Sequence, residues 1–338
     1  MKDDVQILAD LYRTMVRIRA FENAAELASQ GGVSAYGKSA DGSAKVRGPL
    51  HLSTGQEAVA AGVCAHLQHH DYLTSTHRGH GHTLAKGADV QRMMCELFGK
   101  ANGSNGGKGG SMHIADFSVG MLGANGVVAA GLPIAVGAAH AQKLQQREGI
   151  TACFFGDGAI NRGPFLEALN WARVFALPVL FVCEDNRWSA TTASGPMTAG
   201  LGASARAASM DIASEQVDGN DVWAVYSSAG RMVQQVRNGG GPRLLHALTY
   251  RVKGHVSVDA AAYRDANELQ EALKTDPIAR ARQKYLSLPA AEPMQLDAIE
   301  RLAEQEIAAA VAFAEASAWP QASSAFTDVQ NVGAGQWR

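Results

Sequence analysis

The sequence has few cysteines, little net charge and no long apolar run. Four of its 338 residues are cysteines, and no two stand in a Cys-x-x-Cys pair. This spacing carries no zinc or disulfide signature, which is typical of proteins from a reducing compartment. The opening residues, MKDDVQILAD, are acidic and do not resemble a signal peptide. We therefore expect a cytoplasmic protein with free thiols, two of which, Cys153 and Cys183, lie buried in strands.

Membrane spanning and nucleic-acid binding are not expected either. The most apolar stretch, residues 126–141, is interrupted by Gly131, Pro133 and Gly137, and it is too short to cross a bilayer. The formal net charge of −2 offers no broad basic surface for nucleic acid. Hydrophobic residues make up 46% of the chain and charged residues 18%. This balance predicts a large core, with apolar surface left for a protein partner.

Residues 151–188 form the most informative stretch, and they read as strand, turn, helix, strand and turn. The apolar runs TACFF (151–155) and VLFVC (179–183) predict buried strands. Between them, apolar residues at helical spacing predict a helix that ends before Pro178. In a parallel βαβ unit, the polar turns after both strands lie at one edge of the sheet. Open α/β folds bind their ligands at this edge.

Two oxygen-bearing side chains stand in these turns. Asp157 and Asn186 are 186 − 157 = 29 residues apart, which is about one βαβ unit. Carboxylate and amide oxygens are hard ligands, and Mg²⁺ is usually held by few protein ligands together with phosphate oxygens and water. The alternative interpretation is a tight Gly-Asp-Gly turn followed by a helix-capping Asn. The spacing of the pair favours the metal site.

A Gly-Asp-Gly turn followed by a helix, a strand and an Asn resembles the thiamine diphosphate motif. Over residues 21–264 the chain is similar to alpha subunits of the 2-oxo acid dehydrogenase first components, a family that includes acetoin dehydrogenase. Five further ordered blocks carry this resemblance: HLSTGQEA (51–58), HRGHGHTLAKG (77–87), GKGGSMH (107–113), GANGVVAAGLPIAVGAA (123–139) and YRVKGHVSVDAAAYR (250–264).

The resemblance implies a fold and a cofactor site. The fold is an α/β thiamine diphosphate-binding domain with a mainly parallel sheet flanked by helices, and with helical extensions at both termini. Mg²⁺ is expected on Asp157, Asn186 and the carbonyl of Trp188, where it anchors the diphosphate. The remaining contacts implied by the resemblance come from backbone groups: those of Gly158 and Ala159 near the diphosphate, and those of Gly126 and Val128 at the aminopyrimidine ring.

The segment His77-Arg78-Gly79-His80-Gly81-His82 allows two interpretations. One is a metal cluster, but alternating side chains in a strand-to-loop segment do not converge easily. The other is an anion contact, because the forked guanidinium of Arg78 suits a diphosphate oxygen. The resemblance implies that His77 and Arg78 both contact the cofactor, although many family members carry Tyr at the position of His77.

A second polar loop, residues 251–264, resembles the family loop that covers the cofactor and meets the lipoyl group. His255 matches the histidine of that loop, so it is expected to contact the cofactor and to act in catalysis. Asp259, Tyr263 and Arg264 match residues that anchor the loop. Positions that are phosphorylated serines in animal relatives are Val256 and Ala262 here, so this control is expected to be absent.

The implied activity is that of a thiamine diphosphate-dependent oxidoreductase. It cleaves a carbon–carbon bond next to a carbonyl and passes the acyl group to lipoamide. The expected partners are a beta subunit, in an assembly of two alpha and two beta chains, and a lipoyl-bearing acyltransferase. Acetoin is the first choice of small-molecule carbonyl substrate, and pyruvate or a branched-chain 2-oxo acid is the alternative. A nucleotide-binding module would need a GxGxxG motif, which we do not find, and a scaffold would not need Asp157 and Asn186.

The rest of the chain is expected to form one domain over residues 1–338: an N-terminal helix and loop (1–50), a cofactor-binding core (51–265) and C-terminal helices with a tail (266–338). Gln56 and Glu57 are expected to be structural, and His113 to be buried or to line the site. The Gly-rich residues 102–110 read as a flexible loop that lacks the Walker pattern. The other elements expected are an N-terminal helix packed on the sheet (5–30), a loop that is a candidate for disorder (31–48), a helix over 51–67, a mobile loop (189–208), two further strands (210–217, 243–250) around a helix (221–237), and C-terminal helices over 268–285 and 294–317.

Overall fold

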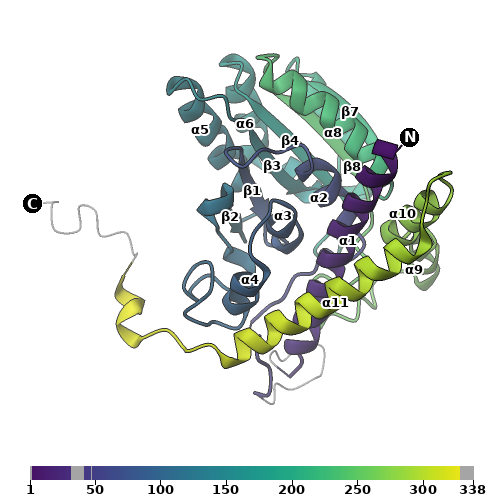
Figure 1. Ribbon diagram of the computed structural model, residues 1–338. Helices are drawn as coiled ribbons and strands as arrows, with labels where there is room; N and C mark the ends of the chain where they lie inside the picture. Colours follow the sequence, from purple (N-terminus) through teal and green to yellow (C-terminus); the bar gives the residue numbers. More distant parts are fainter. Residues whose placement is uncertain (1, 32–41, 47, 328–338) are drawn as a thin grey trace, which may run out of the picture.

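The computed structural model describes residues 2–31, 42–46 and 48–327. Its centre is a six-stranded sheet of strand order β2-β1-β3-β4-β8-β7, and every pairing in it is parallel (Figure 1). The expected α/β fold with a mainly parallel sheet is confirmed. The strands of this sheet are β1 (Tyr72–Thr76), β2 (Met121–Asn125), β3 (Thr151–Gly156), β4 (Val179–Asp185), β7 (Ala213–Asp218) and β8 (Arg243–Leu248).

Alternation along the central strands divides the core into two layers. On β3, Phe154 packs into one apolar cluster, whereas its neighbours Cys153 and Phe155 pack into another. On β4, Val182 and Cys183 are divided in the same way. Both faces of a parallel sheet must be covered, because its crossover connections place helices there. The two central strands are therefore apolar along most of their length, and the sequence shows them as the continuous runs 151–155 and 179–183.

Helices cover both faces of the sheet, but to different depths. One face carries α5 (Gly131–Leu144), α6 (Gly163–Val174) and α7 (Gly202–Ala208). The other carries α2 (Glu57–Cys64) and α8 (Val222–Arg237), and α1 (Lys2–Ala28) packs on α2 as a further layer. Two short helices, α3 (His80–Ala85) and α4 (Val90–Leu97), follow β1.

The terminal helices pack on other helices rather than on the sheet. The expectation that the N-terminal helix lies on the main sheet is wrong, since α1 lies beside α11 (Pro293–Ala316) and also contacts α2 and α10 (Pro277–Leu286) (Figure 1). Arg17 of α1 donates two hydrogen bonds, of 2.8 and 2.7 Å, to the Glu306 carboxylate of α11. This bidentate geometry adds directional contacts between the two helices.

Three segments have a secondary structure that differs from the one expected. The helix expected over 51–67 begins only at Glu57, because residues 51–56 form a buried irregular segment before it. Of the loop expected over 189–208, part is the hairpin of β5 (Trp188–Ser189) and β6 (Thr192–Ala193), and the last seven residues are α7. The helix expected over 268–285 is two helices, α9 (Ala266–Leu273) and α10. Asp276 caps α10, and Pro277 begins it.

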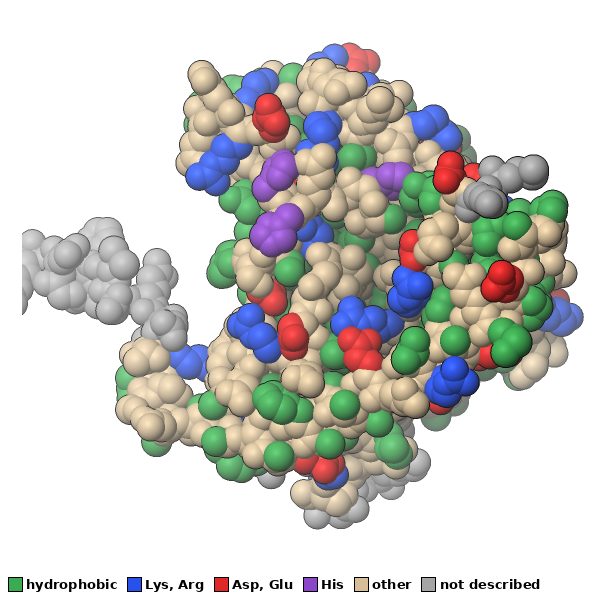
Figure 2. Space-filling view, viewed as in Figure 1, with side chains coloured by type: hydrophobic (Ala, Val, Ile, Leu, Met, Phe, Trp, Pro, Cys, Tyr) green, Lys and Arg blue, Asp and Glu red, His purple; other side chains and the backbone are tan. Residues whose placement is uncertain are grey.

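The loop expected over 31–48 lies mostly outside the described residues, which omit 32–41 and 47. The structure also has five 3₁₀ turns: Ser111–His113, Phe117–Val119, Asp157–Asn161, Gly195–Met197 and Ala322–Phe326. No helix among the described residues is long and apolar enough to cross a membrane. Figure 2 shows basic and acidic side chains interspersed over the visible face, which carries no continuous basic surface of the kind that nucleic acid needs.

The Gly-rich segment 102–110 is held around a carboxylate of its own chain. Glu96, buried at the end of α4, accepts four backbone N–H bonds of 2.7 to 3.0 Å, from Asn105, Gly107, Gly109 and Gly110. Gly107 has a positive φ of 78°, and a Cβ there would collide with the backbone of Gly99. The glycines thus allow the loop to wrap an anion, but that anion is Glu96 rather than a phosphate.

Glu96→Gln should lower the free energy of unfolding by about 3 kcal/mol, because an amide offers one acceptor oxygen where the carboxylate offers two. The N–H groups that face the new –NH₂ lose their acceptor in a buried site. Urea unfolding followed by circular dichroism measures the change. Glu304→Gln, on the exposed side of α11, is the control. Equal stabilities for the two variants would show that the loop does not depend on this carboxylate.

Candidate functional site

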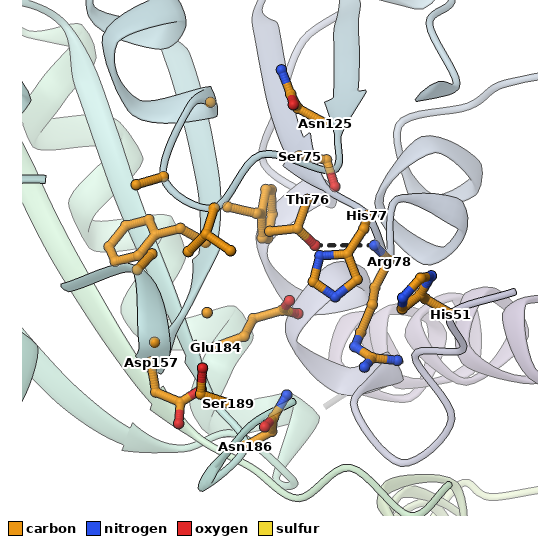
Figure 3. Close-up of a pocket in the computed structure, with 18 of the residues that line it drawn as sticks. His51, Ser75, Thr76, His77, Arg78, Asn125, Asp157, Glu184, Asn186 and Ser189 are labelled. Carbon is orange, nitrogen blue, oxygen red and sulfur yellow. Dashed lines mark hydrogen bonds between the residues drawn. The ribbon is translucent and has the colours of Figure 1, made fainter. Parts of the chain in front are cut away.

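A cavity of about 220 Å³ lies at the carboxyl edge of the sheet. Its walls come from the ends of β1, β3 and β4, from the loop before α5 and from the loop after β8. In Figure 3, Asp157, Asn186 and Ser189 lie at one end and His77, Arg78 and His51 at the other, and Glu184 points between them. This is the edge at which the parallel topology predicts a ligand.

Asp157 presents an unsatisfied carboxylate oxygen at the cavity. The residue is buried, and its Oδ2 has no hydrogen-bond partner in the described part of the chain. Burial raises the pKa of Asp157, and a hydrogen bond from Ser194 opposes this rise. An ionised carboxylate with one free oxygen in a buried site needs a cation or a donor. The observed position therefore fits a metal ligand.

Asn186 lies beside Asp157 because of the strand register. Gly156 of β3 pairs with Glu184 of β4, so the turns after both strands begin at the same level. The Asn186 Oδ1 accepts the backbone N–H of Trp188 at 3.1 Å, which fixes its orientation and leaves a second lone pair. No helix begins here, so the helix-cap interpretation is wrong. The Trp188 carbonyl accepts from Arg251 Nη1 at 3.4 Å.

Gly158 and Ala159 follow Asp157 within the 3₁₀ turn Asp157–Asn161. Glycine is required at the first of these positions, because a Cβ on residue 158 would collide with the Ser189 side chain. At the cavity rim, a Cβ on Gly126 would meet only Met112 and His113 at 3.7 and 3.8 Å. The close backbone approach at residue 158 and the open rim fit a ligand that contacts main chain rather than side chains.

Two arginines bring buried positive charge to the cavity. Arg78 donates to the carbonyls of Leu52 and His255, both at 2.8 Å, and Arg251 donates to Ala190 O at 2.8 Å. Burial lowers the pKa of both guanidinium groups. The charge of Arg251 lowers the pKa of Arg78 further, and the charge of Arg264 does the same to Arg251. Arg264, which donates to Arg251 O, has a buried Nε and Nη2 without hydrogen-bond partners in the described part of the chain. This surplus of positive charge suits an anionic ligand such as a diphosphate.

The structure separates the three histidines of the HRGHGH segment. His80 bonds Glu22 and Ser111, each at 2.9 Å, and His82 bonds Ser75 at 2.7 Å and Glu184 at 3.0 Å. Both are buried within α3, so the expected strand-to-loop alternation is wrong from His80 onward. Among the three, His77 lines the cavity.

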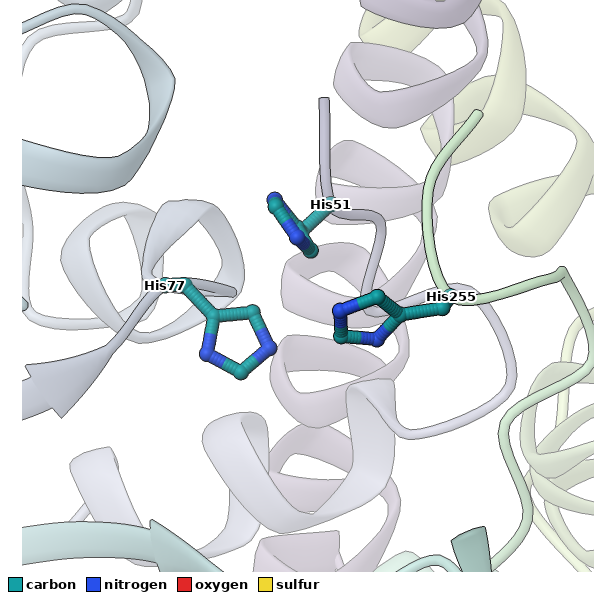
Figure 4. A group of neighbouring side chains, drawn as sticks. All are labelled: His51, His77 and His255. Atoms are coloured by element: carbon teal, nitrogen blue, oxygen red, sulfur yellow. The ribbon is translucent and has the colours of Figure 1, made fainter. Parts of the chain in front are cut away.

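His77 instead joins His51 and His255, which lie far away in the sequence (Figure 4). The ring centroid of His51 lies 4.6 Å from that of His77 and 4.8 Å from that of His255. Each ring offers a nitrogen within 4.8 Å of the others, a spacing that can hold a metal ion. Arg78, however, donates to His255 Nδ1 at 3.1 Å, so the remaining nitrogen of the neutral ring carries the hydrogen. The cluster therefore serves better as a hydrogen-bonding wall than as a cation site.

All three imidazoles stay neutral at physiological pH. Burial lowers the pKa of His51 to about 3, that of His77 to about 2 and that of His255 to about 4, and the charge of Arg78 adds to the effect. A neutral imidazole can donate one hydrogen bond and accept another. The wall can thus orient an uncharged polar group by donating and accepting hydrogen bonds.

The loop that carries His255 is ordered by Asp259. This carboxylate accepts the His255 N–H at 2.7 Å, the Ala261 N–H at 2.8 Å and the Tyr263 hydroxyl at 2.7 Å. Gly254 lies so close to Asp259 that a Cβ would overlap it. The anchoring residues matched from the sequence thus lie where they can fix the position of His255.

The remaining candidates are placed as follows. Val128 is 48% exposed at the cavity rim, and His113 is exposed rather than buried. The structural role of Glu57 is confirmed, because its buried carboxylate accepts hydrogen bonds from Nε and Nη2 of the Arg19 guanidinium. Gln56 differs, since it lines the cavity with both amide atoms unpaired in the described part of the chain.

Sequence reasoning missed several cavity residues that the fold brings in from distant segments. His51 opens the segment that contains Gln56, but nothing in its neighbourhood distinguishes it from a core histidine. Glu184 is the first polar residue at the carboxyl end of β4, and Arg251 is the first charged residue of the loop after β8. Their positions in the cavity depend on tertiary contacts.

The sequence profile of the family described as "Dehydrogenase E1 component" matches residues 38–323. Two similar proteins are acetoin:2,6-dichlorophenolindophenol oxidoreductase alpha subunits. The one from Bacillus subtilis (strain 168) is 43% identical over 320 residues, covering 94% of this chain and 92% of the relative. The one from Cupriavidus necator is 40% identical over 327 residues, covering 96% and 95%. The pyruvate dehydrogenase E1 component subunit alpha of Porphyra purpurea is 38% identical over 286 residues, covering 82% and 83%.

The neutral histidines predict that the protein loses stability as the pH falls below about 6.5. In the unfolded chain a histidine takes up its proton near pH 6.5, whereas His255 in the fold does so only near pH 4. Between these values the unfolded state binds more protons, so acid favours unfolding. Urea unfolding at pH 4.5 to 7 should show a smaller acid loss for His255→Asn than for the wild type. His69→Asn, at an exposed position, should retain the wild-type slope, and equal slopes for all three proteins would contradict the assignment.

Proposed function

The chain belongs to the dehydrogenase E1 component family, and from this we propose that it is the alpha subunit of an acetoin dehydrogenase that uses Mg²⁺ with thiamine diphosphate. The family is one of thiamine diphosphate-dependent oxidoreductases. The observation that carries the proposal is the free, buried Oδ2 of Asp157 beside Asn186 at the carboxyl edge of the sheet. The chemistry of this pair and the positive charge around it support a metal diphosphate as the ligand.

Each residue of the proposed site has a defined task. Asp157, Asn186 and the Trp188 carbonyl would hold Mg²⁺, and the backbone N–H groups of Gly158 and Ala159 would donate to the diphosphate. Arg78 and His77 contact the cofactor from the other wall. Gly126 and Val128 offer main-chain groups to the aminopyrimidine ring. In this structure Arg78 donates to the carbonyls of Leu52 and His255. To contact the cofactor, its guanidinium would have to exchange these hydrogen bonds or share them.

When bound, thiamine diphosphate would supply a nucleophilic carbon for the substrate carbonyl and an electron sink for cleavage of the adjacent carbon–carbon bond. The chain's own contribution would be to orient the substrate and to donate hydrogen bonds to it. His255, which Asp259 holds and Arg78 restricts to one neutral tautomer, donates its Nε2 hydrogen towards the reacting oxygen. We assign His255 to acyl transfer to the lipoyl group more than to cofactor binding, because it lies on the loop after β8.

The relatives named alpha subunits imply a beta subunit as partner. We propose an assembly of two alpha and two beta chains, served by a lipoyl-bearing acyltransferase. The cofactor requires a carboxylate against its aminopyrimidine ring, and in the resembled family a beta-subunit glutamate supplies it. The carboxylates that line the cavity among the described residues are those of Asp157 and Glu184. Asp157 is a proposed metal ligand, and the Glu184 carboxylate is bonded to His82 at 3.0 Å.

Acetoin is favoured over a 2-oxo acid by the relatives and by the charges in the cavity. Both acetoin relatives are more similar to this chain than the pyruvate relative from Porphyra. A 2-oxo acid needs a cation for its carboxylate before cleavage, but the three imidazoles are neutral and Arg78 is assigned to the cofactor. Acetoin is neutral and loses acetaldehyde, so it needs no such partner. A pyruvate or branched-chain 2-oxo acid dehydrogenase remains the second candidate.

Asp157→Ala should weaken thiamine diphosphate binding by more than about 100-fold in the presence of Mg²⁺, since outer-shell partners alone change metal affinity by 10- to 100-fold. Calorimetric titration of the assembled enzyme measures the affinity, and circular dichroism checks the fold. Asp211→Ala removes a carboxylate from an exposed position and should bind normally. Unchanged affinity in Asp157→Ala would remove this residue from the metal site.

Reconstitution tests both the partner and the substrate. The purified chain alone should show no turnover, because it lacks the carboxylate for the aminopyrimidine ring. With a beta chain and a dye acceptor, kcat/KM for acetoin should exceed that for pyruvate by at least about tenfold, which corresponds to 1.4 kcal/mol. Robust turnover without a partner would refute the subunit assignment. A preference for pyruvate would refute acetoin and retain the family.

His255→Ala should separate acyl transfer from cofactor binding. We expect cofactor affinity within about threefold of wild type, but a loss of about 100-fold in lipoamide-coupled turnover, which is the scale for removal of one positioned hydrogen-bond donor. Turnover with the artificial dye acceptor should fall much less. The exposed His69→Ala serves as control. Equal losses in the two assays would show that His255 acts before the transfer step.

A further inference from the structure

The segment before α2 ends in a carboxamide that has no hydrogen-bond partner in the described part of the chain. Gln56 is 1% exposed and lines the cavity, and both its Oε1 and its Nε2 are unpaired there. Unpaired buried polar atoms destabilise a fold, and native proteins retain few of them. Two such atoms on one side chain at a cavity wall point to a ligand that supplies both partners.

A role in capping α2 does not account for this side chain. Gln56 is the N-cap residue of α2, but its side chain makes no capping hydrogen bond. The next residue, Glu57, differs in this respect, because its carboxylate accepts from Arg19 and from the Gly55 N–H, both at 3.0 Å. The fold therefore provides partners for the acid at position 57 and leaves the amide at position 56 open to the cavity.

The backbone around Gln56 is held closely in place. The Gln56 N–H donates to the Ser53 carbonyl at 2.9 Å, and its own carbonyl accepts from the Val59 N–H at 3.2 Å. Gly55 has a positive φ of 95°, and a Cβ there would lie 2.7 Å from the Tyr250 carbonyl oxygen. These contacts restrict any backbone shift that would bring the carboxamide into solvent.

The hydrogen bonds of this segment place Gln56 near the strand ends. The Gly55 carbonyl accepts the Thr249 hydroxyl at 3.3 Å, and the Thr249 N–H donates at 2.9 Å to the carbonyl of Asp185, at which β4 ends. Two hydrogen bonds thus connect the residue before Gln56 with the residue before Asn186. Gln56 therefore lies towards the end of the cavity that carries the proposed metal ligands.

A carboxamide offers two kinds of hydrogen bond at this end of the cavity. The guanidinium of Arg251 and the backbone N–H groups of Gly158 and Ala159 can only donate, whereas Gln56 can donate through Nε2 and accept through Oε1. Mg²⁺ bound to a diphosphate presents both kinds of partner, because phosphate oxygens accept hydrogen bonds and the waters that Mg²⁺ retains donate them. The two unpaired atoms of Gln56 match this ligand.

We propose that Gln56 is a further binding residue for the metal diphosphate, with Nε2 as a donor to a diphosphate oxygen and Oε1 as an acceptor for a water on the metal. This inference rests on the proposed function, because it takes the ligand to be thiamine diphosphate with Mg²⁺. It explains why the fold retains an unpaired buried amide, since both atoms gain partners when the cofactor binds. Residues shaped for binding often lower the stability of the empty protein.

Gln56→Met replaces the carboxamide with an apolar side chain of similar length. In the assembled enzyme it should weaken thiamine diphosphate binding at saturating Mg²⁺ by at least about tenfold, the scale of a lost hydrogen bond to a charged group. The same change should raise the urea midpoint of the cofactor-free chain, because it removes two unpaired buried atoms. Calorimetric titration measures the affinity, and circular dichroism follows the unfolding.

Two further variants sharpen this test. Gln142→Met is the matched control, because Gln142 is also buried but accepts the Thr151 hydroxyl at 3.0 Å and lies outside the cavity. It should bind the cofactor normally and lower the urea midpoint. Gln56→Glu should bind thiamine diphosphate more weakly than Gln56→Met, because it places a carboxylate against the diphosphate.

Wild-type affinity in Gln56→Met would overturn the proposal and leave water as the partner of the carboxamide. A urea midpoint that falls in Gln56→Met, as in the control, would assign the residue a structural role and also overturn it, whatever the affinity. Gln56→Glu that binds as tightly as the wild type would exclude the diphosphate contact. A wild-type enzyme that binds neither thiamine diphosphate nor inorganic pyrophosphate in the presence of Mg²⁺ would instead refute the proposed function.

Discussion

The parallel pairing of β3 with β4 is the constraint on which the rest of this structure depends. Because Gly156 is level with Glu184, the polar turns that follow both strands open at one edge of the sheet. This register, rather than a direct contact between the two side chains, brings Asp157 and Asn186 to the same place. A shift of one residue would turn each side chain to the opposite face and disperse the pair. The parallel connection between β3 and β4 also requires a crossover helix, which is α6.

Positive and negative charges both border the cavity. Arg78 lies at the histidine end, where it donates to the Leu52 carbonyl. Arg251 donates to the Trp188 and Ala190 carbonyls, and Arg264 donates to the Arg251 carbonyl. The imidazoles are kept neutral by burial and by the charges of Arg78 and Arg251. The free carboxylate oxygen of Asp157 lies at the end that also holds Asn186 and Ser189. This arrangement suits a ligand that presents an anionic group to the arginines and a cation to the aspartate, as a metal diphosphate does.

Buried glutamates position the segments around the site. Glu22 accepts the N–H of Ser53 at 2.6 Å and bonds His80, so α1, the segment before α2 and α3 meet at one carboxylate. Glu57 bonds Arg19 and the N–H of Gly55, and Glu96 holds the Gly-rich loop. Such satisfied buried acids fix irregular backbone that regular hydrogen bonding does not hold. The loops near the cavity are thus rigid for reasons that lie outside the cavity.

The sequence by itself determined the parallel α/β class, the two central strands, the helix between them and the pair Asp157 and Asn186. These features are local, because apolar runs, turn residues and spacing along one βαβ unit specify them. The meeting of His51 with His77 and His255 could not be read from the residue pattern, since His255 lies more than 170 positions from the other two and reaches them only when the loop after β8 packs against the segment before α2 and the end of β1. The composition of the Gly-rich loop likewise indicated flexibility but not the Glu96 carboxylate that orders the loop. The sequence predicted the helix between the two central strands, whereas only the tertiary structure shows that Leu144 and Trp171, on the outer side of α5 and α6, are exposed. Contacts between distant segments, and the charges that they bury, are properties of the folded chain as a whole.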